Sequence, residues 1–363
     1  NSGTSNVDFA IEDSSAYCSA NPRLAVTCFG NGNAQLAGTA AAKTSTRTFR
    51  FNNSGYPGEV GYVAPTNLTT QSQTGSAYGV GYSRATGKLY EGAFLRRHTG
   101  LGPGGLGAIY EVNPDSGAVV RTITIPSAGT VPSGRDMTGD ANVVSRDINA
   151  YAAVGKVGLG DVDVIGDGKT LFATNLNTRE LVRVSGLDTV TPVVTSYALP
   201  GSVTCPGGNA DRRIFGLGNR TVSGSTKVYV GVTCTGETGR VAANLAGRII
   251  EFDVATNTFG SNVLSMSLNY TKGCAIFSTN LGYLGCAWNG WSDNWGDATR
   301  IWDTANGVWQ IANPQPIISD IQFDQTGAMV IGVADRGGWQ WGHGNLPPAA
   351  AAYYQDWFGN WLY

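Results

Sequence analysis

Four times along the chain, a short strand pattern is followed by a tight turn rich in Gly and Asp and then by a second, apolar strand pattern. The copies read AYGVGYSRATGKLYEGAF from Ala77, GDVDVIGDGKTLFATNL from Gly160, RIFGLGNRTVSGSTKVYVGVT from Arg213 and SDIQFDQTGAMVIGVAD from Ser319. Before the turn, apolar and polar side chains alternate with the period of two that is typical of a half-buried strand. Each copy therefore predicts a β-hairpin, and the intervals between copies are one or two propeller blades long.

A single hairpin cannot bury both of its faces, so the repeated hairpins must cover one another. A β-propeller does this by arranging four-stranded sheets around a channel. We therefore predict an all-β protein, a β-propeller of four-stranded antiparallel blades, with six blades expected and a range of five to seven. The 51 glycines and 14 prolines suit the many turns of such a fold, in which we expect only one or two helical turns.

The repeat also predicts how the chain is divided. We expect one propeller over residues 1–343 and a separate aromatic tail over 344–363. The predicted blades span about 66–126, 159–200, 205–268, 270–315 and 316–343, with a loop-rich insertion at 127–158. The fourth of these, 270–315, is expected to be irregular and is rich in Trp. The last copy has no outer strands after Gly342, whereas residues 1–65 hold strand patterns at 7–12, 24–29 and 46–52. We expect part of 1–65 to complete the last blade and close the ring, because closure removes exposed sheet edges.

The charge pattern excludes some classes of protein. Charged residues make up 14% of the chain and the net charge is -2, without a basic stripe of the kind that nucleic-acid binding requires. No apolar run reaches the roughly 18 residues of a membrane-spanning helix. The chain does not begin with Met, and its Ser/Asn-rich start suits a mature protein from which a signal peptide was removed. We expect a secreted protein that binds no nucleic acid and does not span a membrane.

Six cysteines support an oxidising compartment, since an even number at short spacings is typical of local disulfides. Proximity along the chain favours the pairs Cys18 with Cys28, Cys205 with Cys234, and Cys274 with Cys286. A zinc site is disfavoured because no Cys-x-x-Cys motif occurs. Four sequons are candidate glycosylation sites in a secreted chain, at Asn52, Asn67, Asn219 and Asn269.

Carboxylates near the start of the inner strands are the candidate catalytic groups. Hydrolytic propellers hold a metal with such residues at the channel mouth, where several blades converge. The corresponding positions here are Asp161, Asp211, Arg213 and Asp320. The alternative is structural: an Asp beside a strand start accepts backbone hydrogen bonds from the next blade.

A second carboxylate group lies in the insertion, where Asp136, Asp140 and Asp147 form a candidate structural Ca²⁺ site on loops of a rigid scaffold. No other cofactor is expected. The two histidines, His98 and His343, accompany no nucleophile motif, so we interpret both as structural or solvent-facing. Arg96 and Arg97 are either an acidic-ligand grip or a salt bridge beside a solvated side chain.

Aromatic residues offer two further binding hypotheses. Trp288, Trp291 and Trp295, with Trp302 and Trp309 nearby, form either a carbohydrate platform or packing between blades. The C-terminal tail carries an apolar set around a single charge, and an exposed patch of that kind marks an interaction site. The set comprises Tyr353, Tyr354, Trp357, Phe358, Trp361, Leu362 and Tyr363. The tail either covers its own propeller or packs into a neighbouring subunit, which would generate a filament if the contact does not close.

Several stretches resemble one known family, the propeller region of large bacterial secreted surface proteins in which adhesin-type B repeats often follow. They are NPRLAVTCFGNG from Asn21, EGAFLRRHTGLGPGGLGAIYEV from Glu91, AVGKVGLGDVDVIGDGKTLFATNL from Ala153, ADRRIFGL from Ala210 and PIISDIQFDQTGAMVIGVADRGG from Pro316. The resemblance covers most of residues 18–343 in the same order and implies a propeller on an exported, surface-associated protein. It carries no activity, and this chain departs from it by its Trp-rich DRGGWQWGHG ending and by the lack of a B repeat.

Together these features predict a secreted, non-catalytic propeller that serves as a structural or adhesive subunit at the bacterial surface. Its expected partners are further copies of itself in an extracellular filament, other surface proteins or glycans. Two alternatives stay open: a metal-dependent hydrolase or lyase acting on a lactone or saccharide, and a lectin-like carbohydrate-binding module.

Overall fold

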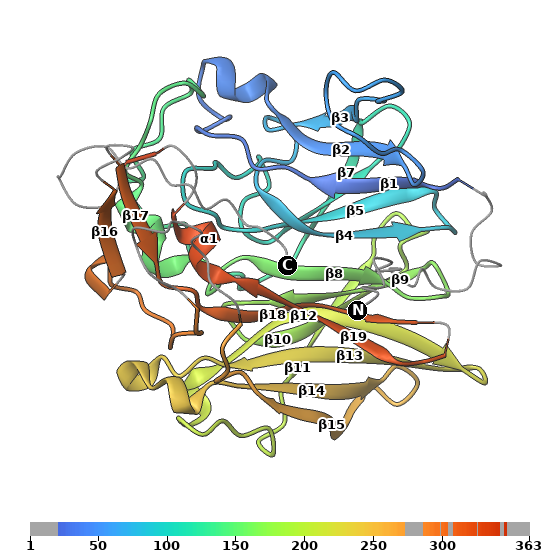
Figure 1. Cartoon of the computed structure of the whole chain (residues 1–363). Coiled ribbons are helices and arrows are strands. Elements are labelled where there is room, and N and C mark those ends of the chain that lie inside the picture. Colours follow the sequence, from blue (N-terminus) through green and yellow to red (C-terminus); the bar gives the residue numbers. More distant parts are fainter. Residues whose placement is uncertain are drawn as a thin grey trace.

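The computed structural model describes residues 21–272, 286–297, 299–303, 308–324, 326–341 and 345–346, with the backbone alone for the two strands between 299 and 312. Strands dominate this part of the chain (Figure 1). They are β1 (Arg23–Thr27), β2 (Thr44–Arg50), β3 (Thr66–Thr70), β4 (Ala77–Ser83), β5 (Lys88–Ala93), β6 (Ala108–Val112), β7 (Val119–Thr124), β8 (Leu159–Val164), β9 (Thr170–Asn175), β10 (Glu180–Ser185), β11 (Val193–Ala198), β12 (Arg212–Val222), β13 (Ser225–Cys234), β14 (Ala246–Asp253), β15 (Thr258–Ser267), β16 (Thr299–Asp303), β17 (Val308–Ala312), β18 (Pro316–Phe323) and β19 (Met329–Asp335).

All four predicted hairpins are confirmed. The pairs β4–β5, β8–β9, β12–β13 and β18–β19 are antiparallel neighbours in the chain. Three of the hairpins continue into four-stranded sheets whose strands follow sequence order, namely β4–β7, β8–β11 and β12–β15. The protein is therefore all-β with several four-stranded antiparallel sheets, as the repeat predicts.

An Asp or Asn side chain holds several of the hairpin turns, two of them in copies of the repeat. Asp167, Asp253 and Asp324 each stand at the start of a hairpin turn, and each carboxylate accepts hydrogen bonds from backbone N–H groups two to four residues further on. Asn113 does the same through its amide oxygen. The side chain imitates a backbone turn, which is why Asp and Asn are favoured there. The GDG sequence around Asp167 is therefore a hairpin turn, as the repeat predicts.

The sheets pack one against the next through their first strands. β4 packs against β8, β8 against β12, and β12 against β18, while β1 lies beside β4. In Figure 1 the sheets accordingly lie one below another, from β1–β3 at the top to β12–β15 at the bottom. Apolar side chains fill the spaces between them: Phe172 and Leu181 pack against Val230 and Phe252, and Ile249 packs against Ile318.

One predicted boundary is wrong. The first four-stranded sheet begins at Ala77 and not near residue 66, because β3 pairs with β2 in a separate sheet, β1–β2–β3. The segment over 270–315, which the sequence predicts to be an irregular blade, is irregular in the part that the structure describes: β16 and β17 form a two-stranded sheet of their own, while β12 packs directly on β18. The number of blades stays a prediction.

The predicted ring closure is not formed by any strand described within 21–65. β1 and β2 pair with each other, and β2 pairs further with β3, which starts at Thr66. β18 and β19 form a two-stranded sheet. The strand pattern at residues 7–12 lies outside the described residues, so its part in closure stays a prediction.

In the part of the chain that the structure describes, helix is limited to short turns, although there are more of them than the sequence predicts. One α-helix, α1, spans Arg336–Trp341. The 3-10 turns are η2 (Thr39–Ala42), η3 (Ile148–Ala153), η4 (Asn209–Asp211), η5 (Thr238–Arg240), η6 (Ala242–Asn244) and η7 (Trp295–Asp297). Over the described ranges, every helix is too short to cross a membrane.

Candidate functional site

Irregular pairing recurs at the same place in the first strand of four sheets. The register shifts between Ala77 and Val80 in β4, between Leu159 and Val162 in β8, between Ile214 and Leu217 in β12 and between Ile318 and Asp320 in β18. A β-bulge of this kind leaves a backbone N–H group without its partner in the ladder. These shifts stand side by side because the first strands pack against one another, and they define the centre of the candidate site.

The Asp161 carboxylate accepts hydrogen bonds from backbone N–H groups at two of these bulges. Its Oδ1 accepts a hydrogen bond from the N–H of Val162 at 2.9 Å, and its Oδ2 accepts one from the N–H of Leu217, in the next sheet, at 3.0 Å. The residue is 8% exposed. Asp320 repeats half of this arrangement, because its Oδ1 accepts from the N–H of Ile321 at 2.8 Å and from Gln322. The structural interpretation of Asp161, that it accepts backbone hydrogen bonds from the next blade, is confirmed.

Glycines opposite these carboxylates let the strands approach closely. A Cβ atom placed on Gly216 of β12 would lie 2.6 Å from the backbone nitrogen of Asp320 in β18. Gly79 of β4 likewise lies against the backbone of Asp161 and Val162 in β8. Real side chains do not reach such distances, so glycine is required where the two backbones meet.

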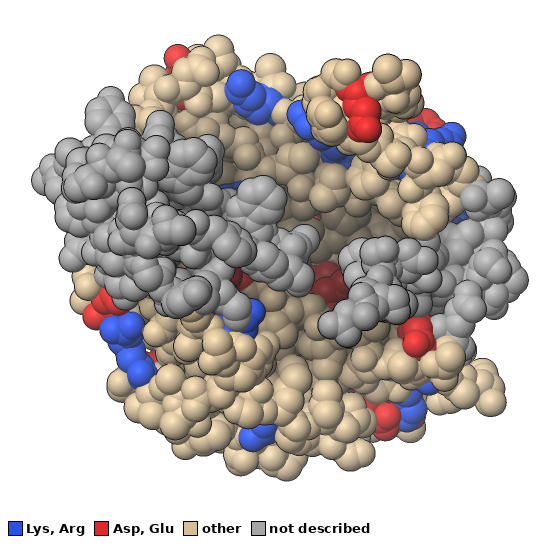
Figure 2. Space-filling view, viewed as in Figure 1, with Lys and Arg blue, Asp and Glu red and all other residues tan. Residues whose placement is uncertain are grey.

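Burial makes this centre unfavourable for negative charge. Burial, together with the charges of Asp163 and Asp320, raises the pKa of Asp161 well above its usual range. Burial also raises the pKa of Asp320 and that of the neighbouring Tyr78 phenol. Figure 2 shows a hollow near the middle of this face with acidic side chains inside it, on a surface where charges are otherwise sparse.

Asp211 and Arg213, the other channel-mouth candidates, belong to different contacts. Asp211 is fully buried, and its Oδ1 accepts hydrogen bonds from the N–H and hydroxyl of Thr238. Arg213 forms an ion pair with Glu237 at 2.6 Å. The four candidates therefore do not converge on one point: Asp161 and Asp320 lie close enough for their charges to interact, while the other two fix the loop that follows β13.

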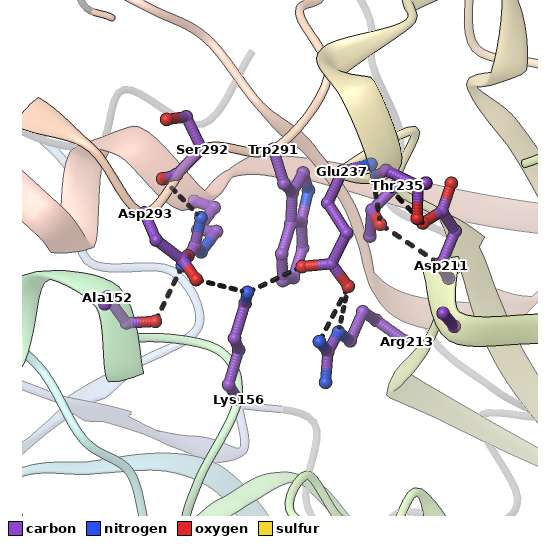
Figure 3. Close-up of polar contacts among 12 residues, drawn as sticks. Ala152, Lys156, Asp211, Arg213, Thr235, Glu237, Trp291, Ser292 and Asp293 are labelled. Atoms are coloured by element: carbon purple, nitrogen blue, oxygen red, sulfur yellow. Dashed lines mark hydrogen bonds and ion pairs between the residues drawn. The ribbon is translucent and has the colours of Figure 1, made fainter. Parts of the chain in front are cut away.

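Lys156 joins two carboxylates into a charged network (Figure 3). Its Nζ lies 2.6 Å from Glu237 and 2.7 Å from Asp293. Burial alone would raise the pKa values of Glu237 and Asp293, but the cationic neighbours outweigh it and hold both pKa values below their usual range. The network ties the insertion before β8 to the loops that follow β13 and precede η7.

Arg336 at the start of α1 anchors the same loops from inside. It is fully buried, and all of its nitrogens donate, with the guanidinium 4.5 Å above the Trp291 ring. The acceptors are the carbonyl oxygens of Ala152, Val154 and Ser292, Oε1 of Gln315 and Oδ1 of Asp293. A guanidinium with every donor satisfied is a structural anchor, and here it fixes the first residue of α1 against these loops.

His98, Arg97 and Arg96 are structural too. His98 is 2% exposed and lies between the Ser145 hydroxyl at Nδ1 and the Trp341 carbonyl at Nε2, so Nε2 carries the proton. Burial, with Arg97 nearby, lowers its pKa well below the usual value. Arg97 is buried and donates to the carbonyls of Arg146 and Gln340, whereas Arg96 lies over the Phe29 ring. The contacts described here do not decide between the two expectations for the arginine pair, which stay predictions.

The three candidate calcium ligands make separate contacts within the protein. Asp147 is buried and its carboxylate pairs with Arg135, which neutralises the charge that a cation would need. Asp136 accepts hydrogen bonds from the N–H groups of Arg146 and Asp147, and Asp140 caps the exposed turn at Asn142. Within the described ranges, His, Cys, Asp and Glu nowhere gather in a group of three that could hold a metal ion.

The tryptophans pack inside the molecule. Trp288, Trp291 and Trp295 are 6%, 1% and 9% exposed, so they offer no open platform for a sugar ring. Trp291 donates to the Pro316 carbonyl, and Trp295 lies against Trp341. Packing, the alternative weighed against a carbohydrate platform, is therefore confirmed for these three. Trp302 and Trp309 are register partners across β16 and β17, and their side chains lie outside what the structure describes.

The cysteine predictions have different outcomes. The predicted Cys205–Cys234 disulfide is confirmed, and Cys286 is also disulfide-bonded, while Cys274 lies outside the described residues. Cys28 has a free thiol, so the predicted bond from Cys18 to Cys28 is not formed, and burial raises the pKa of this thiol.

The remaining surface predictions are not decided by the structure. Asn52, Asn67 and Asn269 are exposed, whereas Asn219 is half-buried in β12 and donates to Asp163. Three sequons thus stay candidate sites in accessible positions. His343 and the aromatic tail residues from Tyr353 to Tyr363 lie outside the described residues.

The sequence reading missed one functional candidate, Glu91 in β5. Its side chain is 0% exposed and accepts a hydrogen bond from the Thr46 hydroxyl at 2.8 Å. Buried hydroxyl groups of Ser45, Thr69 and Thr74 adjoin it between the β1–β3 and β4–β7 sheets. Burial raises its pKa to about 7, partly offset by the Thr46 hydrogen bond. The only sequence signal is a glutamate among apolar neighbours in KLYEGAF.

No protein-family model matches the chain. Among curated proteins, the chain is similar to colossins of Dictyostelium discoideum: 26% identical to colossin-A over 336 residues, 26% to colossin-D over 326 and 27% to colossin-B over 329. These matches cover 91%, 89% and 88% of this chain, but only 3%, 31% and 8% of the respective relatives. The chain thus spans less than a third of each of these proteins.

Among solved structures, the chain is similar to the β-propeller domain of Cps50 (Swd1) from Myceliophteria thermophila, with a TM-score of 0.34 and 10% identity over 92% of this chain and 73% of that one. It is also similar to a putative 6-phosphogluconolactonase from Bacteroides uniformis, with a TM-score of 0.26 and 12% identity over 86% of this chain and 95% of that one. Likenesses at these TM-scores carry no conclusion about activity.

Proposed function

We propose that the chain is a non-catalytic β-propeller scaffold of an exported protein, with a structural or adhesive role at a cell surface. The observation that carries the proposal is the state of Asp161. Both of its carboxylate oxygens are held by backbone N–H groups of two neighbouring sheets, so the group best placed for channel-mouth chemistry joins sheets together.

Export is supported by the Cys205–Cys234 disulfide, because such bonds persist in oxidising compartments. The colossin similarity extends over most of this chain but over a small part of each relative, which suits one module of a larger protein. The similar curated proteins are from Dictyostelium. The proposal that the surface is that of a bacterium therefore depends only on the resemblance of the sequence to bacterial surface proteins.

Assembly into a filament is the finer part of the proposal, and it rests on the aromatic tail at 344–363. We expect deletion of 347–363 to reduce the particle to single propellers in light scattering and electron microscopy. A matched control replaces the same segment with a Gly/Ser sequence of equal length. Assembly that is unchanged by both changes would remove the filament role and leave the scaffold.

The scaffold role itself is tested at the central carboxylates. Thermal unfolding is measured with Ca²⁺, Mg²⁺, Mn²⁺ and Zn²⁺, first for the wild type and then for Asp161→Asn and Asp320→Asn. A scaffold predicts no metal-dependent rise in Tm and a lower Tm for Asp161→Asn, because an amide cannot accept on both sides. A rise that the two substitutions abolish would instead establish a metal centre and refute the proposal.

A further inference from the structure

The loop that joins β2 to β3 is long for a hairpin connection. It comprises fifteen residues, 51–65, between Arg50 at the end of β2 and Thr66 at the start of β3. The connection from β8 to β9, by comparison, has five residues, 165–169. Loops of this length with no helix or strand of their own are uncommon in compact domains, and many of them bind a partner. In Figure 1 the loop lies with β2 and β3 at the top of the molecule.

This loop exposes large apolar side chains to water. Phe51, Tyr56, Val60 and Val63 are 50%, 68%, 102% and 57% exposed. Glu59 is the only charged residue between positions 51 and 65, and its Oε2 accepts a hydrogen bond from the N–H of Tyr56. A single exposed apolar side chain needs no explanation, but a group of them marks an interaction site. Four in one loop therefore indicate a contact surface.

The backbone of the loop keeps its shape without packing against the sheet. Gly58 and Gly61 have φ values of +98° and +87°, which side chains rarely adopt, and a Cβ atom on either would meet nothing within 4 Å. The N–H of Glu59 donates to the Tyr56 carbonyl, and the N–H of Tyr62 donates to the Glu59 carbonyl. Two successive turns thus shape the loop from within, and its apolar side chains stay outside.

We propose that this loop inserts into the surface of a lipid bilayer. A bilayer has no fixed shape, so a projecting loop buries Val60 and Val63 in it without a complementary groove, and burial of apolar area is favourable. Tyr56 suits the boundary between headgroups and acyl chains, where its ring is buried and its hydroxyl stays hydrated. Because the loop contains Glu59 and no Lys or Arg, it has no attraction to anionic headgroups. We expect it to bind zwitterionic lipid.

Two other occupants fit these side chains less well. A saccharide site needs polar groups that converge on the sugar, and Phe51, Val60 and Val63 have no side-chain donor or acceptor. A stable contact with a second copy of the chain involves about 20–30 residues a side, which is more than this loop contains. Insertion into lipid would add a means of attachment to the surface role proposed above, but it depends on the loop alone.

Co-sedimentation of the full chain with phosphatidylcholine vesicles tests the insertion. Wild type should bind at least as strongly at about 0.5 M NaCl as at about 0.1 M, because salt does not screen apolar burial. Val60→Ser combined with Val63→Ser should weaken binding about 100-fold, at roughly tenfold for each valine. The matched control is Val190→Ser combined with Val193→Ser, because these valines in and just before β11 are 93% and 60% exposed. It should bind like wild type.

Three outcomes would overturn the proposal. The first is equal binding by wild type and the Val60/Val63 variant, or no binding by either. The second is binding that requires phosphatidylglycerol and is lost at about 0.5 M NaCl, which would show electrostatic adsorption. The third is a particle that, without lipid, is smaller in light scattering for the Val60/Val63 variant alone, because a second copy would then cover the loop. Urea unfolding of all three proteins should coincide, which excludes unfolding as the cause of lost binding.

Discussion

Replacing Glu91 with Gln should make the stability of the protein less dependent on pH. The carboxyl group is buried among hydroxyl groups, and its pKa is raised from 4.5 to about 7. A raised folded-state pKa means that the folded protein holds a proton that the unfolded chain releases. The stabilisation is fully present below pH 4.5 and is lost as the pH rises through 7. At about 1.4 kcal/mol per pKa unit, the loss by pH 8 is about 3 kcal/mol.

The assay is urea unfolding of the wild type and of Glu91→Gln between pH 4 and pH 8. The amide does not titrate, so the stability of Glu91→Gln relative to the wild type should increase by about 3 kcal/mol across this range. The difference between the two proteins cancels the other buried acids, including Asp335, whose pKa burial raises to about 6. Glu59→Gln changes an exposed loop residue and should follow the wild-type curve. A difference between Glu91→Gln and wild type that stays constant with pH would refute the reasoning.

The remaining predictions concern anchors of the fold, all measured by urea unfolding. Arg336→Met should lower the free energy of unfolding by about 4 kcal/mol, because it leaves buried acceptors such as the Val154 carbonyl unpaired. A decrease of less than about 1 kcal/mol would show that water replaces the guanidinium. Gly216→Ala should lower the free energy of unfolding by about 2 kcal/mol, because the added Cβ overlaps with β18. Gly201→Ala, where the added Cβ meets nothing within 4 Å, should leave it nearly unchanged. Equal effects of the two substitutions would contradict the close approach of β12 and β18. Substituting Ser for both Cys205 and Cys234 should lower the free energy of unfolding by about 3 kcal/mol. An unchanged free energy of unfolding would show that this disulfide does not constrain the unfolded chain.

The repeat predicted the hairpins because its signal is local. Alternation of side chains acts within one hairpin, and so does the Asp at the turns that carry one, so β8, β9 and the Asp167 turn follow from the sequence itself. The order of the sheets is a contact between distant segments. Nothing in the sequence near 270–315 shows that β12 would pack directly on β18 and place β16 and β17 outside the stack.

Side-chain roles were harder to predict for a related reason. Asp161 and Asp147 have the same chemistry in the sequence, yet one bridges two strand bulges and the other pairs with Arg135. Arg336 stands in a glycine-rich stretch that reads as a loop, and its acceptors come from three distant segments. The tryptophan cluster gave two interpretations because composition does not report burial, which decides between packing and sugar binding.

The four copies of the hairpin phrase differ from one another in a way that the packing explains. The first strands of copies one and three carry Gly-x-Gly, at Gly79 and Gly216, where copies two and four carry Asp, at Asp161 and Asp320. Each glycine strand lies against an aspartate strand, so backbone approaches backbone on one side while a carboxylate caps the freed N–H groups on the other. If all four strands carried Asp, steric overlap would separate the sheets, and if all carried Gly, the bulge N–H groups would stay unpaired at about 1–3 kcal/mol each. The alternation is therefore a requirement of this sheet stack, and it assigns the central acids to assembly of the fold.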